Sequence, residues 1–223
     1  MKRFTLVAFV LMLVLMVGVV GAQEEEKVLR LVSGPTGIPY LDPTHATDTQ
    51  SNEIVEHTYT GLTRSNELTG ELEPGLATSW EYDEAANVYT FTLMEGVPWV
   101  RFNPESGMVE EVMDADGNVR YVTAHDVIYG WQRELDPESA AEYSYIVAGW
   151  VEGGAEYNNG EGAWEDVKIM AVDDYTLQFT PTEVTAFVPM IYGLWIVNPL
   201  PQWAIDEFGD QWEDVGNYQS FGP

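Results

Sequence analysis

Apolar side chains recur at every second position in several short segments of the chain. Tyr89, Phe91 and Leu93 alternate with Thr residues, which predicts a strand with one buried face. Two further apolar runs, at residues 167–172 and 175–180, flank an Asp-Asp pair, which predicts a strand, a turn and a second strand.

Other segments place their apolar residues at the spacing of a helix face. Residues 49–62 show this spacing, with Ser51 as the predicted N-cap. Thr123 begins a second such segment, with Asp126 three positions later, which predicts a capped helix that runs to about residue 134. Weaker patterns predict helices over residues 139–150, 187–194 and 199–208.

Turn signals separate these segments. Residues 114–118 read Asp-Ala-Asp-Gly-Asn between two β-prone runs, which predicts a hairpin turn. The same oxygen-bearing residues could form a calcium cage, although the Gly comes too early for an EF-hand loop. Residues 68–74 predict a turn between short strands, and residues 153–162 a surface loop. The mixture of strands and helices indicates an α/β or α+β protein.

The first 22 residues differ from the rest of the chain. Lys2 and Arg3 are followed by an uncharged apolar run from Phe4 to Val20, and Ala22 precedes a polar stretch. This order is typical of a secretory signal peptide. The alternative is an uncleaved membrane anchor, for which the run is near the lower length limit. Either interpretation predicts that the remainder is exported, to the periplasm or the cell exterior.

Composition narrows the class of partners. The chain has 9 basic and 37 acidic residues and a net charge of −28, which would repel nucleic-acid phosphates and anionic lipid headgroups. It has no Cys, which excludes disulfides, a thiol lipid anchor, a Cys nucleophile and thiolate metal sites. We therefore expect no nucleic-acid partner, and a monomer.

No pattern for catalysis is present in the sequence. The three His residues are scattered, and neither a metalloprotease helix motif, a nucleophile elbow nor a phosphate-binding glycine loop occurs. We expect neither an enzyme nor a cofactor or metal site. Aromatic residues are the better candidates for ligand contact, or else for the core: Tyr143, Tyr145, Trp150, Trp195 and Trp203.

Six blocks in a fixed order give the chain a resemblance to a known family. The similarity runs from about Leu29 to Pro223 and resembles the oligopeptide- and dipeptide-binding proteins of ABC importers, solute-binding family 5. The blocks are Leu41–Pro43 with Glu53–Leu62, Pro74–Trp80, Tyr89–Leu93 with Trp99, Val122–Arg133 with Asp136-Pro137, Val172–Leu177, and Pro199–Pro201. The chain departs from the family at Met94, where a basic residue is usual, and in a longer insert over residues 99–121.

The resemblance implies an α/β fold of the type II periplasmic binding protein class, in which two lobes close on a solute like a hinge. This chain would supply the first lobe with its extra subdomain, and the second lobe would be missing. Residues 217–223 match the family's pattern at that point, so we expect a truncated product or a fragment. The implied division is a signal peptide at 1–22, first-lobe sheet at 23–58, an inserted subdomain at 59–165, and first-lobe sheet at 166–223.

The resemblance also implies a site and partners. Relatives pair an extended peptide with the backbone after the first strand, which corresponds to Val32, Ser33 and Gly34, and a pocket tyrosine corresponds to Tyr143. The implied function is capture of peptides for import through a membrane permease. The same fold for a sugar or metal chelate, a sensory or docking role, and a secreted hydrolase that uses a carboxylate pair are the alternatives.

Overall fold

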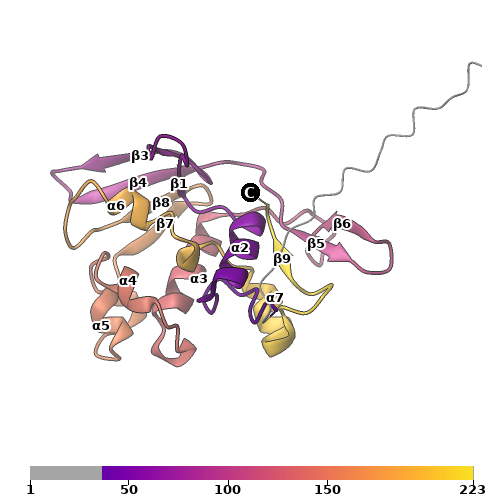
Figure 1. The fold of residues 1–223 in the computed structure, drawn as a ribbon. Coiled ribbons are helices and arrows are strands. Elements are labelled where there is room, and N and C mark those ends of the chain that lie inside the picture. The colour runs from indigo at the N-terminus through magenta and orange to yellow at the C-terminus, as the bar shows by residue number, and fades with distance from the viewer. Residues whose placement is uncertain (1–36, 223) are drawn as a thin grey trace, which may run out of the picture. The chain divides into compact units, whose positions relative to one another are not determined.

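A four-stranded antiparallel sheet is the largest sheet in the part of the chain that the structure describes. The structure is a computed structural model that describes residues 37–222, which lie within one compact unit. The strand order is β3-β4-β8-β7 (Figure 1). These strands are β3 (Ala77–Asp83), β4 (Val88–Leu93), β7 (Ile169–Asp173) and β8 (Thr176–Phe179). The strands predicted around residues 89–93, 167–172 and 175–180 are therefore confirmed.

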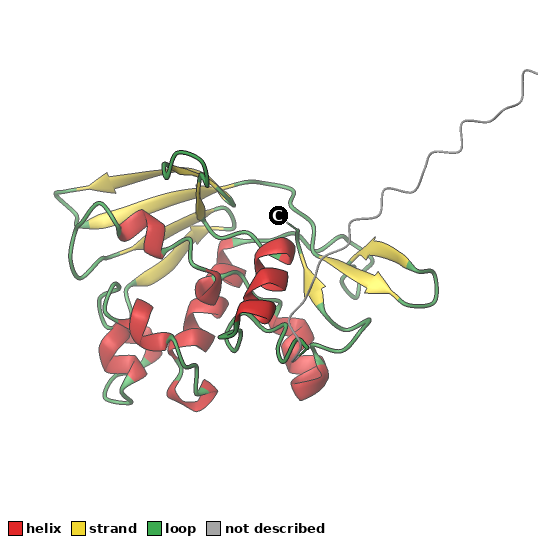
Figure 2. Ribbon diagram, in the orientation of Figure 1, coloured by secondary structure: helices red, strands yellow, loops and turns green. Residues whose placement is uncertain are grey.

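Helix α3 (Ala124–Leu135) packs against this sheet, and Figure 2 shows the helices on one side of it. Trp131 of α3 lies 5.2 Å from Phe179 of β8, measured between ring centroids. Tyr192 stacks on Phe179 at 4.3 Å, and Phe91 meets Phe179 edge to face at 5.8 Å. All four side chains are at most 1% exposed. Burial of each such ring contributes about 1.5–3 kcal/mol, so this aromatic cluster holds the helix on the sheet.

The predicted start of α3 is confirmed. The backbone N–H of Thr123 donates to Oδ2 of Asp126 at 2.8 Å, which is one half of a capping box. Asp126 is buried and also accepts from the indole N–H of Trp99 at 3.4 Å. Loss of water raises the pKa of Asp126 to about 6, although these donors oppose the shift.

Two small sheets and several short helices complete the described chain. The sheets have the orders β1-β2 and β6-β5-β9. Their strands are β1 (Thr63–Ser65), β2 (Leu72–Pro74), β5 (Val100–Asn103), β6 (Met108–Glu111) and β9 (Gln219–Ser220). The helices are α2 (Thr49–Thr58), α4 (Ser144–Ala148), α5 (Gly154–Asn158), α6 (Val188–Ile191) and α7 (Gln202–Phe208), with 3₁₀ turns at Pro137–Ser139, Trp164–Asp166, Trp195–Val197 and Gly209–Gln211. The turn predicted within residues 68–74 and the helix predicted over 199–208 are confirmed.

The N-cap predicted for α2 was wrong. Asp48 is the cap, because its Oδ1 accepts from the backbone N–H groups of Gln50 and Ser51 at 3.0 Å each. Ser51 is instead buried inside the first turn, where its hydroxyl accepts from the N–H of Tyr40 at 3.2 Å. A polar first turn concealed the earlier helix start.

Three segments differ in extent from the sequence prediction. The helix predicted over 139–150 is only α4, because Ala140 has a left-handed backbone with a φ of 52°. The loop predicted over 153–162 contains helix α5, which Gly153 and Gly160 bound with positive φ. The helix predicted over 187–194 is reduced to the four residues of α6.

The prediction of a hairpin around Asp114 is correct for the turn and incomplete for the strands. The backbone N–H of Asp114 donates to the carbonyl of Asn118 at 2.8 Å, and Oδ1 of Asp114 accepts from the N–H of Asp116 at 2.9 Å. Strand β6, however, pairs with β5. The longer insert is thus a hairpin of β5 and β6 followed by a side-chain-stabilised turn.

The main sheet spans one of the predicted domain boundaries. Strand β4 belongs to the predicted inserted subdomain and β8 to the predicted second part of the lobe, yet Phe91 and Leu177 are direct partners across the pair. The division of the chain into those parts stays a prediction. The predictions for residues 1–36, which include the signal peptide and the first strand, lie outside the described residues. No helix within 37–222 is long and apolar enough to cross a bilayer.

Candidate functional site

Two aromatic side chains from distant parts of the chain meet at one face of the protein. The rings of Tyr143, just before α4, and Trp195 lie edge to face, with centroids 6.0 Å apart and an interplanar angle of 82°. Both side chains are half-buried. They therefore form a wall with an apolar face and polar tips, as ligand pockets commonly use.

This wall holds the segment that leads into α2. The indole N–H of Trp195 donates to the carbonyl of Ala46 at 3.0 Å, and the hydroxyl of Tyr143 donates to the carbonyl of Thr47 at 3.4 Å. Asp48 then caps α2. The wall thus holds two successive carbonyls of this segment, and the residue after them caps the helix.

The start of the same segment is anchored by buried charges. Asp42 is 1% exposed, and its Oδ2 lies 2.6 Å from Nη1 of Arg133 on α3. The carboxylate of Glu213 accepts from the backbone N–H groups of Leu41 and Asp42, the latter at 2.8 Å. Hydrogen bonds to charged groups are about twice as strong as neutral ones, so these contacts fix the approach to the wall.

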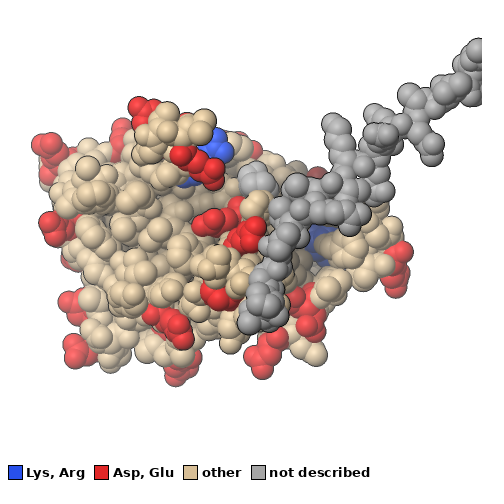
Figure 3. Space-filling model, in the orientation of Figure 1, with Lys and Arg blue, Asp and Glu red and all other residues tan. Residues whose placement is uncertain are grey.

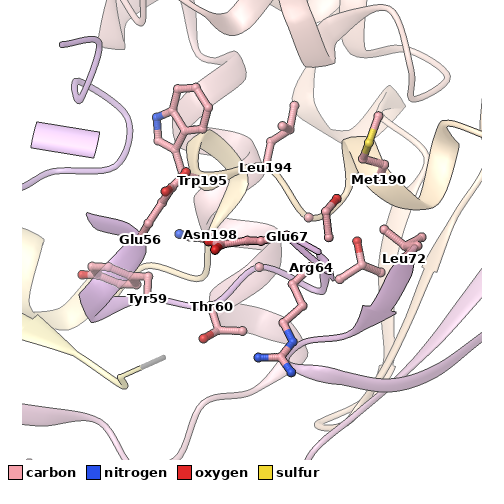
Figure 4. Close-up of a pocket in the computed structure, with 14 residues that line it drawn as sticks. Glu56, Tyr59, Thr60, Arg64, Glu67, Leu72, Met190, Leu194, Trp195 and Asn198 are labelled. Carbon is pink, nitrogen blue, oxygen red and sulfur yellow. The ribbon is translucent and has the colours of Figure 1, made fainter. Parts of the chain in front are cut away.

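Trp195 also belongs to the lining of a pocket of about 450 Å³. The end of α2, the β1–β2 hairpin and residues 190–198 enclose it, and Figure 4 shows their side chains. It is lined by Glu56, Tyr59, Thr60, Gly61, Thr63, Arg64, Ser65, Glu67, Leu72, Met190, Gly193, Leu194, Trp195 and Asn198.

Two glycines let the walls of this pocket approach each other. A Cβ on Gly61 would lie 2.2 Å from the carbonyl oxygen of Gly193, and one on Gly193 would lie 2.4 Å from that of Thr63. Real side chains do not tolerate such distances, so Gly is required where the two segments cross. The crossing sets the back of the pocket.

Charge in the pocket is mainly negative. Glu56 and Glu67 are exposed at its edge. Arg64 also belongs to the lining, but its guanidinium lies 3.4 Å from Glu73, a residue outside the lining. In Figure 4 this guanidinium points away from Glu56 and Glu67. Figure 3 shows acidic side chains spread over this face of the protein with few basic ones. The surroundings therefore reinforce the negative potential.

Two buried polar side chains line the deep part of the pocket. Tyr59 donates its hydroxyl to the carbonyl of Gln219 at 2.5 Å, and burial raises the pKa of this phenol well above its usual value, so it stays a donor. Asn198 is 2% exposed, and its Oδ1 has no hydrogen-bond donor among the described residues. Such an acceptor is costly unless a donor reaches it.

Of the four residues predicted as the ligand site, the structure describes Tyr143 alone, so that site stays a prediction. Tyr143 lies beside Trp195 as described above, whereas Val32, Ser33 and Gly34 lie outside the described residues, so their role stays a prediction. Sequence reasoning missed Glu56, Glu67 and Asn198, because nothing in their local patterns distinguishes them from an ordinary surface or core residue.

The other candidate residues lie elsewhere. Trp203 packs edge to face on Trp99 at 5.6 Å, lies under the guanidinium of Arg120 at 4.4 Å and donates its indole N–H to Oε1 of Gln219 at 2.9 Å, so it serves the core. Trp150 packs against the core, and Tyr145 is 69% exposed. Within residues 37–222 no group of three or more His, Asp or Glu side chains could hold a metal ion.

Solved periplasmic binding proteins match this arrangement of antiparallel sheets and short helices, and the fold is that of a lobe of a type II periplasmic binding protein. The chain belongs to the bacterial extracellular solute-binding proteins of family 5: the profile of that family's middle region matches residues 71–223. The family predicted from the order of the sequence blocks is thereby confirmed.

Individual relatives give the same result. The periplasmic oligopeptide-binding protein OppA of Escherichia coli K12 is 32% identical over 206 residues, which cover 91% of this chain and 34% of the relative. The dipeptide-binding protein DppE of Bacillus subtilis is 34% identical over 160 residues, covering 72% and 24%. The solved structure of Listeria monocytogenes OppA bound to peptide matches with a TM-score of 0.69 and 29% identity, over 83% of this chain and 33% of that one.

The chain spans about a third of the length of these oligopeptide-binding relatives. All of them are named as binding proteins and none as an enzyme.

Proposed function

We propose that this protein is the exported peptide-capturing component of an ABC importer. The observation that carries the proposal is the wall of Tyr143 and Trp195, which is hydrogen-bonded to the backbone of Ala46 and Thr47 beside an open pocket. Two of the matched relatives are named as an oligopeptide-binding and a dipeptide-binding protein, and this supports the choice of a peptide as the ligand.

The ligand lies along this wall in extended form. Backbone contacts provide affinity without selecting side chains, and residues 32–34 contribute further contacts of that kind. The protein acts as a monomer without catalysis or cofactor, and it delivers the peptide to a membrane permease. The apolar run within residues 1–22 directs its export.

Calorimetry tests the proposal directly. The chain without residues 1–22 is titrated with a mixture of di- to pentapeptides, and we expect saturable but weak binding, because a single lobe leaves one side of the peptide in water. Tyr143→Ala should weaken binding at least tenfold. Phe102→Ala, which removes a 45% exposed ring on the distant β5–β6 hairpin, serves as the control and should not change it.

Two outcomes would contradict the proposal. One is binding of a sugar or metal chelate with no response to peptides. The other is peptide binding that Tyr143→Ala and Phe102→Ala weaken equally, because it would place the ligand away from the wall.

A further inference from the structure

We propose that the pocket lined by Trp195 selects peptides that carry a lysine or arginine side chain. This inference rests on the proposed function and adds the chemical class of peptide that the site prefers. Three features of the pocket carry it: an apolar wall, two carboxylates at the edge, and an acceptor in the interior that lacks a donor.

The pocket and the aromatic wall have one residue in common. Trp195 belongs to both, since it contacts Tyr143 and also lines the pocket. Its indole N–H donates to the carbonyl of Ala46, so the orientation of the ring is fixed. A peptide that lies along Tyr143 can therefore direct one side chain past Trp195 into the pocket.

The lining suits a long aliphatic stem with a charged end. Leu72, Met190 and Leu194 offer apolar surface to methylene groups, as lysine and arginine stems require. The volume of about 450 Å³ is at the lower end of the range for small-ligand sites, and exceeds what a single side chain fills.

The charges in the pocket favour a cation. Glu56 comes from the last turn of α2 and Glu67 from the β1–β2 turn, so two independent elements bring carboxylates to one opening. Neither is in an ion pair with a side chain of the described part of the chain. Arg64, the basic side chain in the lining, is bound to Glu73. An anionic side chain would meet repulsion here.

Asn198 provides the independent argument for a ligand. Its amide is buried in the lining, and Oδ1 lacks a donor within residues 37–222. Figure 4 shows this side chain among those that line the pocket. An ammonium group has three donors and a guanidinium five, so either can serve an amide oxygen and a carboxylate together.

The test uses the indole N–H resonance of Trp195 in NMR spectra of the protein, assigned with Trp195→Phe. The probes are acetylated and amidated Ala-Lys-Ala, Ala-norleucine-Ala and Ala-Glu-Ala, which differ in one side chain. We expect the Lys peptide to bind at least fivefold more tightly than the norleucine peptide. Glu56→Gln and Glu67→Gln should each reduce that preference at least twofold, while Glu81→Gln, an exposed carboxylate on β3 outside the lining, should leave it unchanged.

The outcomes separate the two levels of the proposal. Equal binding of the Lys and norleucine peptides, or a preference that Glu56→Gln and Glu67→Gln leave intact, would overturn the selectivity and leave the proposed peptide function standing. Peptides that shift other resonances but not that of Trp195 would also overturn the selectivity and leave the proposed peptide function standing. If no resonance responds to any peptide, both proposals fail.

Discussion

Replacement of Glu134 by Gln should stabilise the protein, and the gain should grow with pH. Glu134 lies in the last turn of α3 and is fully buried, and neither of its carboxylate oxygens has a hydrogen-bond donor among the described residues. Burial is the largest cause that raises its pKa to about 9, and the charge of Asp42 adds to the shift while Arg133 opposes it. The carboxyl group is therefore neutral in the folded protein at pH 7.

The magnitude follows from the linkage between protons and folding. The carboxyl group has an ordinary pKa of 4.5 in the unfolded chain, so its raised value favours folding most below that pH. The favourable contribution is lost as pH rises from about 4.5 to about 9, at 1.36 kcal/mol per pH unit. At pH 7 the loss relative to acid is about 3 kcal/mol. Gln keeps the shape of the neutral acid without this dependence, so about 2 kcal/mol of net gain is expected at pH 7 after its own amide is buried.

Urea denaturation at pH 5, 7 and 9 measures the effect. The quantity to follow is the free energy of unfolding of Glu134→Gln minus that of the original protein, which should rise with pH. Glu138→Gln, an exposed neighbour just past α3, is the control and should show no trend. A difference that stays constant from pH 5 to pH 9 would refute the reasoning, because Glu134 would then have the same pKa in the folded and unfolded states.

Three further changes probe the framework of the site. Gly193→Ala should lower the free energy of unfolding by at least ~2 kcal/mol, because the new Cβ would lie 2.4 Å from the carbonyl oxygen of Thr63. Gly149→Ala is the control: its Cβ would meet no atom within 4 Å, so the melting temperature should change little. Asp48→Ala should cost about 1 kcal/mol in urea denaturation through loss of the N-cap; no loss would mean that the cap bonds are replaced by water at no cost. Arg133→Met should cost about 3–5 kcal/mol, because it leaves Asp42 buried and unpaired, and a near-neutral result would show that this carboxylate is hydrated.

The sequence predicts elements well where one physical signal dominates. Strand β4 and the start of α3 follow directly from alternation at Tyr89 to Leu93 and from the Thr123 capping box. Prediction from the sequence fails where neighbouring local signals favour different structures. Ala140 has no local feature that announces a positive φ, and the Gly-rich segment after residue 153 gives no sign of the helix that it contains.

The candidate site is predictable only in part, because its residues meet through the tertiary fold. Tyr143 and Trp195 could both be named as aromatic candidates for ligand contact, and the resemblance singled out Tyr143. Their contact depends on the segment at Ala46 and Thr47, which no local pattern places beside them. The role of Asn198 depends on an unmet hydrogen bond, and this is a property of the folded state that the sequence does not display.

The pairing of β5 with β9 has a consequence for how the protein acquires its structure. Val100 is hydrogen-bonded in register with Ser220, so this contact closes a loop of roughly 120 residues. During synthesis the β5–β6 hairpin waits with one edge open until residues 219–220 have emerged. Because closure over long sequence distances is slow, attachment of β9 is expected to follow formation of the β5–β6 hairpin, whose open edge is vulnerable to aggregation until then.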